Sequence, residues 1–249
     1  MKIFALGDLH LAGDVSKSMG IFGENWKDHD KKIKKNWERV VGDEDLVLIP
    51  GDISWAITLE GVKSDLEWID ALPGKKVLIR GNHDYWWKSI SKVRSILPPS
   101  VMAIQNDSLL FDDIAIAGTR LWDFYGSDFS DYIKWISRES IGLPPEKDLS
   151  ADSDKIYNRE IQKLNLSLES VHGRAKKIIV MLHFPPFDFS FKDNEITMTL
   201  QKFGIDICVF GHLHSLKKES MPKFPVKKWG IKFHLVSSDF VDFVPIRIL

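Results

Sequence analysis

The sequence predicts an α/β fold in which parallel strands are joined by crossover helices, with polar side chains gathered beyond the strand ends. Short apolar runs rich in β-branched residues alternate with segments of helical periodicity. Several of these runs are followed directly by a cluster of Asp, Asn or His residues. Because strand, cluster and helix recur in this order over residues 1–90, we expect a parallel sheet that carries its ligands at the carboxyl edge.

Several of the expected strands are unbroken apolar runs, which is the pattern of strands covered on both faces. They lie at 3–6, 46–49, 76–79, 114–117, 178–182, 207–210, 233–236 and 241–249. Strands dominate the later part of the chain, so a more mixed or antiparallel sheet is expected there.

Apolar residues at helical spacing predict four helices, around 33–40, 62–69, 90–97 and 157–171. Thr58 is the expected N-cap of the second helix. The Pro- and Ser-containing stretch 143–154 is expected to be a loop, and the aromatic-rich segment 120–140 an insertion whose form the pattern leaves open.

The composition fits a cytoplasmic α/β protein. A chain of 249 residues with 44% hydrophobic and 28% charged residues can bury one substantial core, so one domain spanning 1–249 is expected. The formal charge of −1 argues against a generally cationic nucleic-acid surface. A single cysteine, Cys208, suits a reducing compartment. The N-terminus lacks a signal-peptide pattern and no apolar run reaches membrane-spanning length, so no membrane partner is expected.

Five of the eight histidines belong to one ordered series of polar clusters. In order, the clusters are Asp8-Leu9-His10, Gly51-Asp52, Gly81-Asn82-His83-Asp84, His183 and Gly211-His212-Leu213-His214. Oxygen and imidazole donors delivered repeatedly to strand ends are typical of a metal centre, and these donors are too many for one ion. The series therefore predicts a dinuclear site.

The spacing within the clusters predicts how side chains converge. Residues i and i+2 at a strand end point the same way, so Asp8 and His10 are expected to reach one ion together, as are His212 and His214. Glycines in three of the clusters allow the backbone to turn tightly. Each feature alone is weak, and only the ordered set is specific. His29, His172 and His234 have no companions at ligand spacing and are treated as ordinary residues.

The series resembles the calcineurin-like metallophosphoesterase superfamily, whose pattern is Asp-x-His, Gly-Asp, Gly-Asn-His-Asp/Glu, His and Gly-His-x-His. The match spans residues 8–214 and every metal-ligand position is filled. The resemblance implies a four-layer α/β/β/α sandwich of mixed sheets. It also implies that Asp8, His10 and His214 hold the first metal, that Asn82, His183 and His212 hold the second, and that Asp52 bridges both.

The expected activity is hydrolysis of a phosphomonoester or phosphodiester by metal-bound hydroxide. Two divalent ions about 3.5 to 4 Å apart lower the pKa of a shared water and offset charge in the transition state. Mixed carboxylate, amide and imidazole donors suit Mn, Fe or Zn better than Mg, without choosing among the three. The expected partner is a small phosphate ester, which includes nucleotides.

In the resembling family the histidine of the Gly-Asn-His motif assists the leaving oxygen, so the resemblance implies this role for His83. His83 and the bridging Asp52 are the expected catalytic residues. Protein-phosphatase relatives orient that histidine with an aspartate three residues after the bridging one. Trp55 stands there in this chain, so the usual partner of His83 is missing. Asp84 is expected to hold its loop by hydrogen bonds rather than to bind metal.

Arg120 follows an expected strand and could aim its guanidinium at a substrate phosphate, with a structural salt bridge as the equally weighted alternative.

Two other functions of the protein stay open. A metal-dependent nuclease acting on DNA or RNA is supported by the five lysines between 217 and 228 and by Trp55, Trp86 and Trp87. A solvated strand edge and helix packing explain these residues at least as well. A non-catalytic scaffold is disfavoured by the complete ligand set. The leaving group, the native metals and the oligomeric state are left open by the sequence.

Overall fold

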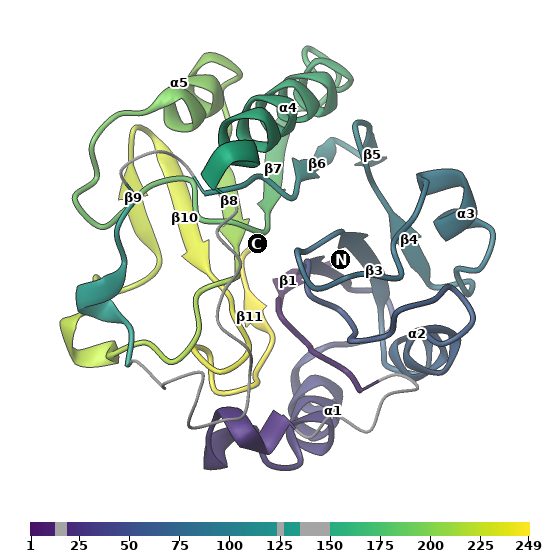
Figure 1. The fold of residues 1–249 in the computed structure, drawn as a ribbon. Helices are drawn as coiled ribbons and strands as arrows, with labels where there is room; N and C mark the ends of the chain where they lie inside the picture. Colours follow the sequence, from purple (N-terminus) through teal and green to yellow (C-terminus); the bar gives the residue numbers. More distant parts are fainter. Residues whose placement is uncertain (13–18, 124–126, 135–149) are drawn as a thin grey trace.

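The computed structural model describes residues 1–12, 19–123, 127–134 and 150–249. Two β-sheets pack face to face at the centre, and helices cover both outer faces (Figure 1). This is the four-layer α/β/β/α sandwich of mixed sheets that the resemblance implies, so the predicted fold is confirmed. Within the described ranges, no helix has both the length and the apolar character needed to cross a membrane.

The first sheet has the strand order β11-β1-β2-β3-β4, and its neighbours are parallel except at β11. Its strands are β1 (Ile3–Ala5), β2 (Leu46–Pro50), β3 (Lys75–Ile79), β4 (Val101–Ala103) and β11 (Ile246–Arg247). Its outer face packs against α1 (His29–Val40), α2 (Lys63–Asp70) and α3 (Ile90–Arg94).

The second sheet has the order β5-β6-β7-β8-β10-β9. Its inner strands are parallel, whereas β5 and β9 pair antiparallel at the two edges. Its strands are β5 (Ser108–Phe111), β6 (Ile114–Thr119), β7 (Lys177–Leu182), β8 (Ile207–Phe210), β9 (Val226–Lys228) and β10 (Ile231–Leu235). The outer face packs against α4 (Ser150–Glu169) and α5 (Glu195–Lys202).

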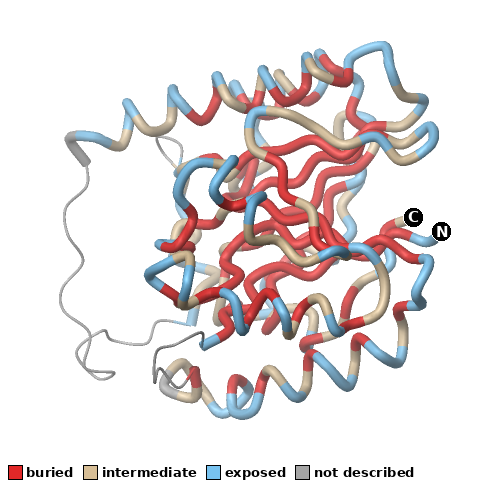
Figure 2. The backbone as a smooth tube through the Cα atoms, turned by 90° about the vertical axis from the view of Figure 1, so that its right-hand side faces the viewer, coloured by how far each residue is buried: buried red, intermediate tan, exposed pale blue. Residues whose placement is uncertain are grey.

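The central strands are apolar throughout because both of their faces are covered. In β2, Leu46 and Leu48 face the opposite sheet, whereas Val47 and Ile49 face the helices. All four side chains are fully buried, and the buried strands fill the middle of the molecule between helical layers (Figure 2). Each such side chain contributes roughly 1.5 to 3 kcal/mol by leaving water.

Several element predictions need correction. Thr58 does not cap α2, which begins at Lys63; its hydroxyl instead accepts from the Gly61 N–H in the preceding turn. The expected strand 241–249 shrinks to β11, because a turn occupies residues 238–243. The end of the expected loop 143–154 is wrong, since α4 begins at Ser150, and residues 143–149 lie outside the described ranges, as does much of the aromatic-rich segment.

The buried imidazole of His234 in β10 should make stability fall in mild acid. The side chain is 4% exposed, and burial lowers its pKa to about 4. The unfolded chain takes up this proton near pH 6.5 and the folded chain near pH 4, so the stabilising contribution is complete above pH 6.5 and is lost as pH falls towards 4. His234→Leu should reduce the drop in unfolding free energy between pH 7 and 4.5 by up to about 3 kcal/mol. Urea unfolding at both pH values measures this, and an unchanged drop would contradict it.

Candidate metal centre

The predicted cluster residues meet at the carboxyl ends of strands from both sheets. Asp8 and His10 follow β1, Asp52 follows β2, and Asn82 with His83 follows β3. His183 follows β7, and His212 with His214 follows β8. Because β2 packs over β7, the two sheets deliver these side chains to one place. The structure therefore brings together the whole predicted set.

The backbone conformation that brings these side chains together differs from the predicted one. β1 ends at Ala5 and β8 at Phe210, so Asp8, His10 and His212 lie beyond the pleated strands. These three residues and Asp52 have left-handed backbone conformations, with φ between 46° and 71°. Residues other than glycine rarely adopt this backbone conformation, and those that do are found mostly at functional sites. Asp8 and His10, like His212 and His214, therefore converge through tight turns. The prediction that they point the same way because they alternate along a strand is wrong.

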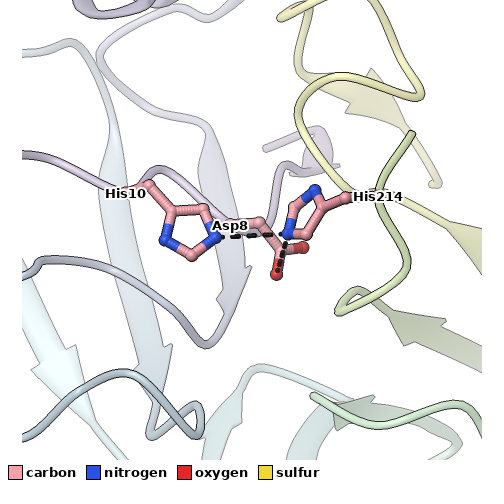
Figure 3. A group of neighbouring side chains, drawn as sticks. All are labelled: Asp8, His10 and His214. Atoms are coloured by element: carbon pink, nitrogen blue, oxygen red, sulfur yellow. Dashed lines mark hydrogen bonds and ion pairs between the residues drawn. The ribbon is translucent and has the colours of Figure 1, made fainter. Parts of the chain in front are cut away.

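Asp8, His10 and His214 form one group of potential ligands, with donor atoms within 4.8 Å of one another (Figure 3). The Nε2 atoms of His10 and His214 lie 3.2 Å apart, and Asp8 Oδ1 lies 3.5 Å from His214 Nε2. Asp8 is fully buried and His10 nearly so. The group supplies one carboxylate and two imidazoles, a donor set suited to a transition metal or zinc.

A second group surrounds His183. Its Nε2 lies 2.6 Å from Asn82 Oδ1 and 3.5 Å from Asp52 Oδ1. Asn82 Oδ1 is also 3.2 Å from Nδ1 of His212. Asp8 is also near this group, because its Oδ1 lies 3.8 Å from His183 Nδ1. That nitrogen, however, already contacts the Pro50 carbonyl at 3.0 Å. The Nε2 side, towards Asn82, is therefore the one open to a metal.

Asp52 lies between the two groups and presents one oxygen to each. Its Oδ2 is 3.7 Å from His10 Nε2, and its Oδ1 is 3.5 Å from His183 Nε2. The carboxyl group is almost completely buried. Burial raises its pKa well above the ordinary value, and the negative charges of Asp84 and Asp8 add to this effect. Gathered carboxylates of this kind are stabilised when a cation lies among them.

The protonation state of His183 is also consistent with a bound metal ion. Burial lowers its pKa to about 4, so the ring is neutral at pH 7 and carries a single N–H. Both ring nitrogens nevertheless face oxygen acceptors, the Pro50 carbonyl and Asn82 Oδ1. If Nδ1–H donates to Pro50, the Nε2 lone pair faces the Asn82 oxygen, and a cation bound by both atoms removes this conflict.

Two glycines make room for the central carboxylates. A Cβ atom at Gly81 would collide with Asp52, and one at Gly211 would collide with Asp8. Any larger residue would push apart the loops that carry the ligands. The glycine positions in the motifs are thus explained by close approach of the backbone to the site.

Asp239, after β10, is a site residue that the motif search missed. Its Oδ1 accepts from His214 Nδ1 at 2.8 Å, and its Oδ2 accepts from the Ser215 N–H at 2.8 Å. Burial opposes a charge on His214, but Asp239 and Asp8 outweigh it and raise the pKa of this imidazole. A carboxylate directly after an expected strand, the signal used for the other clusters, would have found Asp239.

Asp239→Ala should weaken metal binding about 10- to 100-fold, because a carboxylate behind a ligating histidine fixes its ring and increases its basicity. Calorimetric titration with Mn²⁺ measures this directly. Asp242→Ala is the matched control, since Asp242 is exposed and pairs with Lys218 on the surface. Equal affinities in the two variants would contradict this role for Asp239.

Asp84 organises the loops that carry Asp52 and Asn82, as expected from the sequence. It accepts from the backbone N–H groups of Gly81, Ile53 and Ser54, and from Trp86 Nε1. The carboxyl group is fully buried. His29, treated as ordinary in the sequence, supports the neighbouring loop, because its Nε2 lies 3.1 Å from the Leu9 carbonyl and 3.2 Å from that of His10.

His83 is partly exposed, whereas Asp8, Asp52 and His183 are buried. The backbone N–H of His83 donates to Asp52 Oδ1 at 2.8 Å, and the Nδ1 of His83 is 3.3 Å from the Tyr85 hydroxyl. The Trp55 ring lies 4.6 Å from the His83 ring and stacks on His10 at 5.1 Å. Trp55 thus occupies space beside His83, and the Tyr85 hydroxyl lies within hydrogen-bonding distance of its Nδ1.

The remaining substrate-side candidates are placed as follows. Arg120 donates to Glu160 of α4 at 3.1 Å and its guanidinium lies 4.8 Å from the Trp122 ring, so the structural salt bridge is present. Trp86 and Trp87 are buried in the core beneath the first sheet. Lys227 and Lys228 lie on the edge strand β9, where lysines protect against strand pairing.

Comparison with known proteins agrees with this geometry. The family model described as calcineurin-like phosphoesterase matches residues 1–216, which confirms the resemblance found from the motifs. A probable cyclic nucleotide phosphodiesterase from Coxiella burnetii is 25% identical over 232 residues, covering 86% of this chain and 76% of that protein. The gene 66 protein of Mycobacterium phage L5 is 40% identical over 77 residues, and the match covers 31% of this chain but only 37% of the phage protein's length.

Among solved structures, the phosphopantetheinyl hydrolase from Mycobacterium tuberculosis has a similar fold. The TM-score is 0.51 at 14% sequence identity, and the alignment covers 95% of this chain and 88% of that one. At this level of identity the similarity concerns the fold alone.

Proposed function

The chain belongs to the calcineurin-like phosphoesterase family, whose members hydrolyse phosphate esters, and on that premise we propose that it hydrolyses a small phosphomonoester or phosphodiester at a dinuclear metal centre. The observation that carries the proposal is the position of Asp52, with one carboxylate oxygen towards each group of donors. Asp8, His10 and His214 would hold one ion, and Asn82, His183 and His212 the other. The donor chemistry suits Mn, Fe or Zn.

When bound, two neighbouring divalent ions lower the pKa of a shared water and offset the negative charge that builds on the phosphoryl group. The protein's own groups complete the reaction. Water gives up one proton to solvent and attacks phosphorus as hydroxide, and the ester P–O bond breaks. The leaving oxygen would take a proton from His83, which would recover it from solvent. In this scheme no side chain becomes covalently phosphorylated.

A Mn²⁺-supplemented screen tests this function. It compares p-nitrophenyl phosphate, bis-p-nitrophenyl phosphate and cyclic nucleotides, the last included because of the Coxiella relative's name. We expect hydrolysis of at least one class, abolished by a chelator and restored by Mn²⁺. No hydrolysis by fully metallated protein would favour an interaction scaffold. Cleavage of single-stranded DNA as fast as the chromogenic diester would favour a nuclease.

A further inference from the structure

A small polar cavity lies beside the metal-ligand loops, between the ends of β3 and β6. Arg80, directly after β3, and Arg120, directly after β6, line it together with Lys163 of α4. Gln105, Thr119 and Glu160 complete its polar wall. The cavity volume of about 40 Å³ has room for a few waters or one small oxyanion, and not for a nucleoside.

The cavity wall carries more positive than negative charge. Its one carboxylate, Glu160, is 2% exposed and already binds Thr119 Oγ1 at 2.7 Å, Arg120 at 3.1 Å and Lys163 at 2.7 Å. The side chain of Arg80 makes no hydrogen bond or ion pair with any residue that the structure describes. Three cationic side chains therefore face a single carboxylate that is fully engaged.

Two buried donors in this wall lack acceptors. The Nε–H groups of Arg80 and Arg120 are both buried and have no hydrogen-bond partner in the described part of the chain. Burial lowers the pKa of Arg120; Glu160 counteracts this effect, and the positive charge of Arg80 adds to it. Buried polar groups are almost always paired, so two unpaired guanidinium donors in the wall of one cavity leave hydrogen-bonding capacity that water or an anion can satisfy.

The cavity adjoins the metal centre through the backbone on both sides. Gly81, the residue after Arg80, packs against Asp52 so closely that a Cβ would collide with it. The Arg120 carbonyl accepts from the His183 N–H at 3.2 Å and from the Phe184 N–H at 2.9 Å. An anion held by the two arginines would therefore lie next to the loops that carry Asp52 and His183.

We propose that Arg80, Arg120 and Lys163 form an anion subsite for a second phosphate or carboxylate group of the substrate. This inference rests on the proposed function and narrows the substrate class to esters with two separate anionic groups. The subsite recognises an oxyanion through guanidinium and ammonium donors. Hydrolysis at the metals does not require this anion subsite. Its role is therefore to determine which phosphate esters are preferred as substrates.

The kinetic test compares adenosine 3′,5′-bisphosphate with adenosine 5′-monophosphate in the Mn²⁺-loaded protein. We expect kcat/KM to be at least about tenfold higher for the bisphosphate, the size of effect that one or two charge-assisted hydrogen bonds produce. Arg80→Met and Lys163→Met should each remove most of this preference with Mn²⁺ content unchanged. Arg39→Met, which removes an exposed arginine of α1, should keep the preference. Equal ratios in wild type and Arg80→Met would overturn the proposal.

A binding test separates this proposal from the proposed function. Sulfate is titrated calorimetrically into Mn²⁺-loaded wild type, Arg80→Met and Arg39→Met. We expect Arg80→Met alone to lose one class of sulfate site, or to bind at that site at least about tenfold more weakly. This result would support the subsite even if neither nucleotide were hydrolysed, in which case only the proposed function fails. Sulfate binding without any preference for the bisphosphate substrate would contradict the substrate assignment.

Discussion

Asp52→Asn should lower turnover of a phosphate ester by at least about a thousandfold, because this change removes the carboxylate that presents one oxygen to each donor group. The variant should also bind fewer metal ions per chain. Its metal-free form should be more stable than the metal-free wild type, since Asp52 loses a charge that burial and the carboxylates of Asp84 and Asp8 disfavour. Steady-state kinetics and thermal unfolding with and without Mn²⁺ measure the three effects.

Asp45→Asn is the matched control for this substitution. Asp45 is also a buried aspartate, but it accepts from the backbone N–H groups of Lys2 and Gly42, away from the metal-ligand loops. The control should lose stability and keep both metal content and turnover. Full metal occupancy in Asp52→Asn would show that Asp52 does not bridge two ions.

His83→Gln should reduce turnover about a hundredfold or more while the Mn²⁺ content stays at the wild-type level. The residue is partly exposed and is not among the expected ligands of either metal, so its loss should remove proton transfer to the leaving oxygen and leave the metals in place. Kinetics with p-nitrophenyl phosphate and elemental analysis of the same sample provide the measurement.

Tyr85→Phe accompanies this test, because it removes only the hydroxyl that lies 3.3 Å from His83 Nδ1. Its loss of turnover should be smaller than that of His83→Gln, as expected of a residue that orients another. Loss of bound metal from His83→Gln would mean that this histidine is a ligand and that its assigned role is wrong.

The strand-and-cluster order predicted which residues meet, because parallel strands place their carboxyl ends at a shared edge. Asp8, Asp52 and His183 come from distant parts of the chain, yet each follows an unbroken apolar run, and this was enough to place all three at the site. The left-handed turns at Asp8 and His10 were not predictable, because the residues themselves do not show where the strand ends.

Other features were hidden because their sequence signals are weak. The edge strands β5 and β9 are short and partly exposed, so neither presents the unbroken apolar run that marks a central strand. The hydrogen bond between Tyr85 and His83 and the pairing of Arg120 with Glu160 depend on side-chain directions and on how α4 packs against β6. Spacing along the chain carries no information about either.

Anomalous diffraction at the manganese edge, from crystals of the Mn²⁺-loaded protein, tests the central claim most directly. The account predicts two peaks about 3.5 to 4 Å apart, one on each side of the Asp52 carboxylate. One peak would be near His10 and His214, and the other near Asn82 and His183. A single peak, or none at full Mn²⁺ loading, would contradict the dinuclear centre and the hydrolytic role built on it.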